Sequence, residues 1–256
     1  MVAASWILSG NRLLAALPGA EQLRWMRHLE PVELVAGQVL YESGRIPPYA
    51  YFPTTAVVSL LCLGEDGTAD ELAVVGREGV VGVSVFMDGE SSLGRAVVQA
   101  TGAAFRLRAR LIQDEFEQSS PAMHLLVHYL LALGAQVSQT ALCNRHHGLS
   151  QRLCRRLLQG LDRHPNGELE MTHELLAGLL GVRREGVTQE AKKLQDAGWV
   201  RYSRGHLFVL DRKGLESHAC ECYGVVEKEF QRLLPRVAFS PACPPADRLA
   251  AACPAA

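Results

Sequence analysis

Hydrophobic and polar residues alternate with helical periods most clearly in residues 171–210. A cluster of leucines predicts a first short helix, with Thr172 as its N-cap. Its apolar ridge consists of Leu175, Leu176, Leu179 and Leu180. Gly181 suits a left-handed turn at the end of this helix. A second helix then has an inward stripe at i, i+4 and i+7, formed by Val187, Ala191 and Leu194.

The other face of the second predicted helix is polar. It carries Arg183, Arg184, Glu185, Thr188, Gln189 and Lys192. Such side chains offer hydrogen bonds to base edges and contacts to phosphates. Residues 200–210 alternate and turn at 203–206, as a β-hairpin does. The whole pattern predicts a winged helix-turn-helix that binds DNA; the competing interpretation is a helical hairpin packed inside a larger domain.

Short runs rich in β-branched and aromatic residues fill much of the first half of the chain. The runs are 39–41, 50–52, 56–63, 70–75 and 95–99. Glycine, proline and aspartate turn signals separate them, which favours a small antiparallel barrel or sandwich. Residues 11–29 ahead of these runs predict one or two short helices.

A long apolar helix is predicted from Ala122 to about Leu142, opened by Pro121. Its one-sided stripe comprises Val127, Leu130, Leu131, Gly134, Val137, Ser138 and Ala141. A helix this apolar must be buried against another surface. Because the chain has a single DNA-binding module, we expect that surface to be the same helix of a second subunit.

These patterns predict an α+β fold with a jelly-roll-like antiparallel β-barrel, a long dimerisation helix and a C-terminal winged helix-turn-helix. The expected segments are a helical segment 1–30, a sensor barrel 31–120, a dimerisation helix 121–148, a DNA-binding domain 149–218, and a C-terminal helix and tail 219–256. The Pro/Ala-rich composition of the tail is typical of disorder.

Composition and charge agree with this interpretation. The 256-residue chain has a net charge of −1, yet residues 150–216 hold 12 Lys and Arg against 9 Asp and Glu. A mildly basic module on an acidic remainder fits DNA binding by one part of the chain. The seven cysteines are scattered and no secretory segment is evident, which indicates the reducing cytoplasm. The apolar run 6–17 is too short to span a membrane.

The order of barrel, long helix and winged helix-turn-helix resembles the Crp/Fnr family of bacterial transcription regulators, over roughly residues 32–216. Four stretches carry the resemblance: 37–44, 51–60, 79–98 and 181–188. The third lies where the family keeps its phosphate-binding cassette. The last, Gly-Val-Arg-Arg-Glu-Gly-Val-Thr, matches the family's DNA-reading turn and helix. The resemblance implies a cytoplasmic homodimer that binds double-stranded DNA and contacts RNA polymerase, with a barrel that binds either an unidentified small molecule or no ligand.

Roles for individual residues follow from the resemblance by position. Arg184 matches the arginine that reads guanine, and Glu185 the glutamate that accepts from a cytosine amino group. Gln189 occupies the third base-reading position. The remaining candidates are better placed to contact the DNA backbone; they are Arg183, Thr188 and Lys192, with Arg204 and His206 in the wing.

Departures from the family's ligand-binding pattern argue against a cyclic nucleotide as the effector. Gly82 matches the glycine of the family's glycine–glutamate pair, but Val83 follows it and cannot bond a ribose hydroxyl. The family's phosphate-binding arginine and serine fall on Gly94 and Arg95, which leaves Arg95 as a candidate anion contact. Ser138 lies near the family's adenine contact. Gly82, Arg95 and Ser138 are therefore the effector candidates.

Metal and enzyme chemistry find little support in the sequence. The first cysteine is Cys62, so the N-terminal iron–sulfur cluster of the oxygen-sensing branch is not expected. Three histidine and cysteine groups have ligand-like spacing: His124/His128, Cys143/His146/His147 and His218/Cys220/Cys222. None has four ligands, so no metal site is predicted. A cupin-like oxygenase lacks its His-x-His pair, and hydrolase and nucleotide-binding motifs are absent, so we expect no enzyme. A regulatory module that binds a ligand or partner without DNA remains the alternative.

Overall fold

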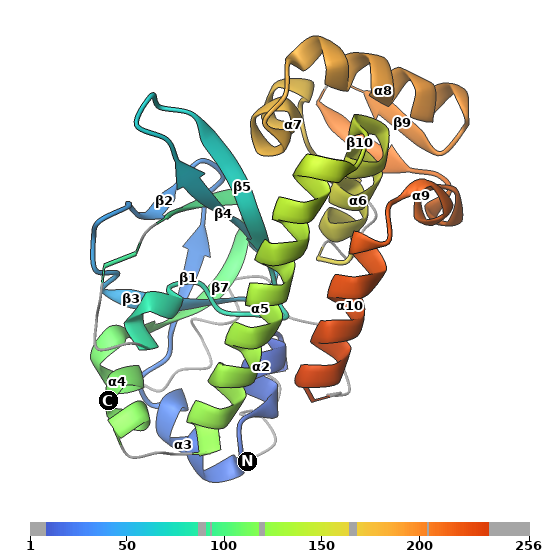
Figure 1. The fold of residues 1–256 in the computed structure, drawn as a ribbon. Coiled ribbons are helices and arrows are strands. Elements are labelled where there is room, and N and C mark those ends of the chain that lie inside the picture. The colour runs from blue at the N-terminus through green and yellow to red at the C-terminus, as the bar shows by residue number, and fades with distance from the viewer. Residues whose placement is uncertain are drawn as a thin grey trace. The chain divides into compact units, whose positions relative to one another are not determined.

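The computed structural model divides the chain into two compact units (Figure 1). It describes residues 9–86, 91–92, 94–117, 121–163, 168–203 and 205–235. The first unit comprises residues 1–60, 74–131 and 231–256 of the chain, and the second comprises residues 61–73 and 132–230.

Antiparallel strands dominate the first half of the chain. They are β1 (Glu30–Leu34), β2 (Val39–Tyr41), β3 (Tyr49–Pro53), β4 (Val57–Leu63), β5 (Ala69–Val75), β6 (Arg95–Ala100) and β7 (Gly102–Arg108), with a 3-10 turn, η1, at Val83–Phe86. One sheet has the order β1-β7-β3 and the other β2-β6-β4-β5. Each of the five predicted runs coincides with a strand to within one residue at its ends, whereas β1 and β7 were not predicted.

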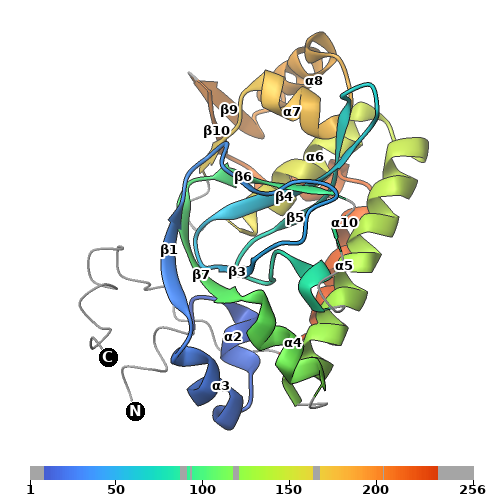
Figure 2. The ribbon, with the colours of Figure 1, turned by 90° about the vertical axis from the view of Figure 1, so that its left-hand side faces the viewer.

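Helices α2 (Arg12–Ala16), α3 (Gly19–Met26) and α4 (Ala109–Glu117) lie together at one end of these strands (Figure 2). Asn11 caps α2, and its side-chain amide donates to the carbonyls of Pro53 and Gly79, both at 2.8 Å. Arg24 of α3 grips the Glu115 carboxylate of α4 with bonds of 2.7 and 2.8 Å. The sequence predicted one or two short helices ahead of the strands, and the structure has two there, α2 and α3.

Helix α5 (Pro121–His146) is the long apolar helix that the sequence predicts. One side is buried, and Tyr129 there donates a hydrogen bond to the Val80 carbonyl at 3.0 Å. The predicted stripe lies on the other side and is exposed or half-buried: Leu131 is 57% exposed and Val127 is 37% exposed. By length and composition alone, α5 also satisfies the criteria for a membrane-spanning helix, as buried helices of other proteins do.

The second unit holds the remaining helices and a three-stranded sheet. They are α6 (Leu149–Leu161), β8 (Glu168–Glu170), α7 (His173–Leu180), α8 (Arg184–Asp196), β9 (Val200–Ser203), β10 (His206–Val209), α9 (Arg212–His218) and α10 (Cys222–Leu233), whose last turn passes into the first unit. Leucines of α6, α7 and α8 share one core with Val200, Leu207 and Leu215. The predicted α+β fold, with its N-terminal sheets and C-terminal helix-turn-helix, is confirmed.

A buried ion pair fixes the tip of the β4–β5 hairpin within the second unit. Arg156 of α6 is 1% exposed, and Glu71 of β5 is 6% exposed. The guanidinium donates to both carboxylate oxygens, at 2.5 and 3.0 Å. This bidentate geometry is the one that best compensates for the free-energy cost of removing both charges from water.

Candidate nucleic-acid interface

The turn between α7 and α8 is built by capping interactions. The Thr172 hydroxyl accepts from the Leu175 amide at 3.1 Å and starts α7. Gly181 ends that helix with φ of +61°, a left-handed conformation that glycine adopts without steric cost. The Val182 amide then bonds back to the Ala177 carbonyl at 3.0 Å, which closes the helix end. The predicted helix-turn-helix is therefore present.

Burial separates the two faces of this motif. On α8 the predicted inward residues Val187, Ala191 and Leu194 are buried. On α7 the buried residues are Leu176, Ala177, Leu179 and Leu180. The assignment of Leu175 to this ridge was wrong, since it is 37% exposed. At about 100° per residue, it falls just outside the arc that the four buried side chains span.

The outward face of α8 is open to solvent over its first two turns. All six predicted contact residues on this face are exposed: Arg183, Arg184, Glu185, Thr188, Gln189 and Lys192. A shallow hollow on this face is lined by Arg184, Glu185, Thr188 and Gln189. Arg184 also reaches Glu174 of α7 at 3.8 Å, but both side chains are largely exposed. Such an ion pair is weak, so the guanidinium remains available to a stronger acceptor.

His173 supports this face from behind, a contact that no sequence pattern indicated. Its Nδ1 lies 3.0 Å from the Thr188 hydroxyl, which donates its own hydrogen to the Arg184 carbonyl at 3.0 Å. The ring Nδ1 must therefore donate, which leaves Nε2 buried without a partner among the described residues. Burial, together with the Arg184 charge, holds the pKa of His173 below its usual value. The imidazole next to Arg184 is thus neutral at pH 7.

The predicted wing is a real hairpin. Strands β9 and β10 pair antiparallel, with Ser203 opposite His206, and β8 extends the sheet on the other side of β10. The wing candidate His206 is half-buried, and the other candidate, Arg204, lies outside the described residues. Strand β8 was not predicted.

The effector candidates of the first unit lie at separate contacts. Gly82 has φ of +97°, and a Cβ there would approach the Tyr49 carbonyl to 3.0 Å. Arg95 grips the Glu42 carboxylate with two bonds of 2.7 Å, which lowers the pKa of Glu42. The third candidate, Ser138, is exposed on α5 in the second unit. An anion at Arg95 would have to displace a carboxylate.

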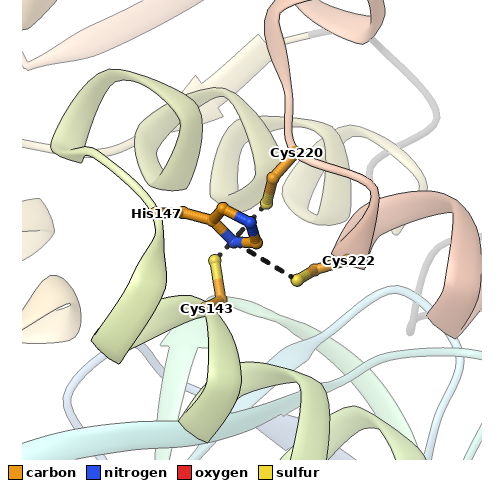
Figure 3. Close-up of side chains that lie close together, drawn as sticks. All are labelled: Cys143, His147, Cys220 and Cys222. Atoms are coloured by element: carbon orange, nitrogen blue, oxygen red, sulfur yellow. Dashed lines mark hydrogen bonds between the residues drawn. The ribbon is translucent and has the colours of Figure 1, made fainter.

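Four metal-ligand side chains meet elsewhere in the second unit. Cys143, His147, Cys220 and Cys222 place their ligand atoms within 4.8 Å of one another, and Figure 3 shows the side chains pointing toward each other. Cys143 and His147 come from one predicted group, and Cys220 and Cys222 come from another. The other members of these two groups, His146 and His218, are exposed and do not take part in the cluster. The hydrogen bond between the thiols of Cys143 and Cys220 lowers the pKa of the Cys220 thiol. This group has the donor set of a metal site.

Comparison with known proteins agrees with the geometry. Residues 151–218 match the Crp-like helix-turn-helix domain. FixK2 from Bradyrhizobium japonicum has a similar structure, with a TM-score of 0.65 and 15% identity over 75% of this chain and 98% of its own. A Crp/Fnr-family regulator from Thermus thermophilus gives 0.58 and 26% over 74% and 98%. The c-di-GMP-responsive regulator CLP from Xanthomonas campestris gives 0.60 and 18% over 75% and 99%. No curated protein matches the sequence.

Proposed function

We propose that this chain, whose residues 151–218 match the Crp-like helix-turn-helix domain, is a DNA-binding transcription regulator of the Crp/Fnr family that acts as a homodimer on an inverted-repeat operator. The observation that carries the proposal is the exposed polar face of α8 above a fully buried apolar one. Two such helices, one per subunit, would enter successive major grooves about 34 Å apart. The functional segments are the sensor 31–120, the dimerisation helix 121–148 and the DNA-binding domain 149–218.

Base reading is assigned to three exposed residues at the start of α8. Arg184 presents a planar fork that donates to O6 and N7 of guanine together. Glu185 accepts from the cytosine amino group, and Gln189 pairs with the next base. The phosphate contacts, which fix position rather than sequence, are assigned to Arg183, Thr188, Lys192, Arg204 and His206. His173 acts by holding Thr188 in place.

Dimerisation is assigned to the exposed face of α5. This face carries Leu131, Val127 and Leu142, which are 57%, 37% and 44% exposed. Apolar side chains repeated along a helix favour association with an equivalent helix, because burying them removes their surface from water. A second copy of α5 therefore accounts for the apolar composition that this helix shares with membrane-spanning segments.

The sensor domain is proposed to bind a small effector other than a cyclic nucleotide. Val83 offers no acceptor for a ribose hydroxyl, and Glu42 already holds Arg95. Gly82, Arg95 and Ser138 remain the effector candidates. We assign no catalytic activity to the chain, place it in the cytoplasm, and propose RNA polymerase as its protein partner.

Binding measurements with two α8 variants test the assigned roles. Arg184→Ala should weaken binding to the preferred operator by about 1–3 kcal/mol and relax the preference at one base pair. Lys192→Ala should weaken all sequences evenly and reduce the slope of log K against log salt by about 0.9. Lys213→Ala, an exposed lysine of α9, is the matched control and should change neither. An unchanged sequence preference for Arg184→Ala would remove Arg184 from base reading.

Sedimentation of the full chain tests the dimer. Leu131→Glu should shift the protein to monomer and abolish binding to the two-half-site operator. Leu23→Glu, at a leucine of α3 that is 58% exposed, should leave the dimer intact. A dimer that survives Leu131→Glu would place the interface elsewhere.

A further inference from the structure

We propose that Cys143, His147, Cys220 and Cys222 bind one zinc ion in the second unit. Cys143 and His147 lie one turn apart at the end of α5, and Cys220 and Cys222 lie where α9 passes into α10. All four belong to the second unit, although more than 70 residues separate the two pairs. The ion would join the end of α5 to the α9–α10 connection.

The four ligand atoms all lie within 4.8 Å of one another, close to the spacing around a single tetrahedral ion. Zinc binds sulfur at about 2.3 Å and nitrogen at about 2.0–2.1 Å, so tetrahedral edges are about 3.8 Å between sulfurs and about 3.5 Å between sulfur and nitrogen. The Sγ atoms of Cys143 and Cys220 lie 3.4 Å apart, and Cys222 Sγ lies 3.5 Å from His147 Nδ1. An iron–sulfur cluster distributes its four protein ligands over two or four irons, so the four ligand atoms could not all converge on one point.

The imidazole is oriented as a metal ligand requires. His147 Nε2 lies 3.2 Å from the Glu221 carboxylate, while Nδ1 faces the sulfurs. A hydrogen on Nε2, donated to Glu221, leaves the Nδ1 lone pair free to bind an ion. In zinc sites, a carboxylate usually accepts a hydrogen bond from the ring nitrogen of the histidine that does not bind the metal. Buried thiols that serve only as small apolar groups have no need of this arrangement.

Burial makes this a closed structural site. Cys143 and Cys222 have no exposed surface and Cys220 is 4% exposed, so the three sulfurs form a small core of their own. Four protein ligands fill the tetrahedron and leave no position for a substrate. Zinc binding would therefore stabilise the folded second unit, because the unfolded chain does not hold the four ligands together.

Metal analysis of the full-length reduced protein tests the proposal. We expect one zinc per chain, and Co²⁺ in its place should give the thiolate charge-transfer and strong visible bands of a tetrahedral site. Glu221→Gln, an exposed position, should keep the site and weaken zinc affinity about 10–100-fold. Octahedral cobalt spectra, or no metal bound from micromolar zinc, would overturn the proposal.

Substitutions at cysteines separate metal binding from general destabilisation. Cys143→Ser and Cys220→Ser should lose zinc, whereas Cys154→Ser, at a buried thiol of the α6 core, should lower thermal stability and retain zinc. Cys62→Ser, at an exposed thiol, should change neither. Removal of zinc by a chelator should lower the Tm of the wild type and leave that of Cys143→Ser unchanged. Equal zinc content in Cys143→Ser and wild type, or a Cys143–Cys220 disulfide in the protein as isolated with no metal, would contradict the site.

Discussion

Replacing Glu71 by alanine should destabilise the second unit strongly, because it removes the carboxylate that pairs with the buried guanidinium of Arg156. The Arg156 side chain is 1% exposed and donates hydrogen bonds of 2.5 and 3.0 Å to the Glu71 carboxylate. Breaking a buried ion pair on one side typically costs about 3–5 kcal/mol. With an unfolding entropy of about 2.1 cal/mol/K per residue over a unit of about 110 residues, this corresponds to a Tm lower by about 10–20 °C.

Thermal unfolding followed by circular dichroism and calorimetry measures this effect. Glu65→Ala, at an exposed carboxylate in the same hairpin, should stay within about 0.5 kcal/mol of the wild type. The double variant Glu71→Leu/Arg156→Met should regain most of the lost stability, since apolar replacement of a whole buried pair is often neutral. A loss below about 1 kcal/mol for Glu71→Ala alone would refute the reasoning.

Three further predictions concern α7 and its caps. Gly181→Ala should destabilise by about 1–2 kcal/mol because of its left-handed φ, and further because a Cβ there would collide with the Asp70 carboxylate. Gly178→Ala, in mid-helix with open space at Cβ, should instead stabilise by about 0.5–1 kcal/mol. Equal effects of the two substitutions in chemical denaturation would contradict the turn. Thr172→Ala should cost about 0.5–2 kcal/mol of unfolding free energy through loss of the cap, and an unchanged denaturation midpoint would argue against it. Since the pKa of His173 is lowered by burial and by Arg184, its stabilising contribution is complete above about pH 6.5 and is lost as the pH falls through the folded pKa; an NMR titration that gives a pKa at or above 6.5 would refute this.

The helix-turn-helix could be predicted closely because local chemistry determines it. Gly181 supplies the turn conformation, Thr172 supplies the cap, and the stripe of Val187, Ala191 and Leu194 sets which face of α8 is outward. The error at Leu175 came from treating adjacent leucines as one ridge without assigning each its angle around the helix.

Strands β1 and β7 escaped prediction because their strand character comes from their pairing with each other. Strand β1 contains Pro31 and two glutamates among its five residues, and β7 begins with Gly102 and two alanines. Neither run alternates clearly, yet the two pair residue by residue from Glu30–Arg106 to Leu34–Gly102. Such long-range pairing leaves no local signal in one sequence.

The four-ligand group was hidden for a similar reason. The sequence grouped Cys143 with His146 and His147, and His218 with Cys220 and Cys222, because these residues are neighbours along the chain. From the first group the fold selects Cys143 and His147, one turn apart, and it brings Cys220 and Cys222 of the second group to them. Only the tertiary structure determines which residues of two incomplete groups meet.

Selection of bound duplexes from a random DNA pool tests the central claim most directly. The purified full-length protein would be used with and without added cyclic AMP and cyclic GMP. We predict enrichment of a palindromic motif without any nucleotide, with half-sites one helical turn apart, and loss of preference at one position for Arg184→Ala. An unpaired half-site, enrichment only with nucleotide, or no enrichment in any condition would contradict the account.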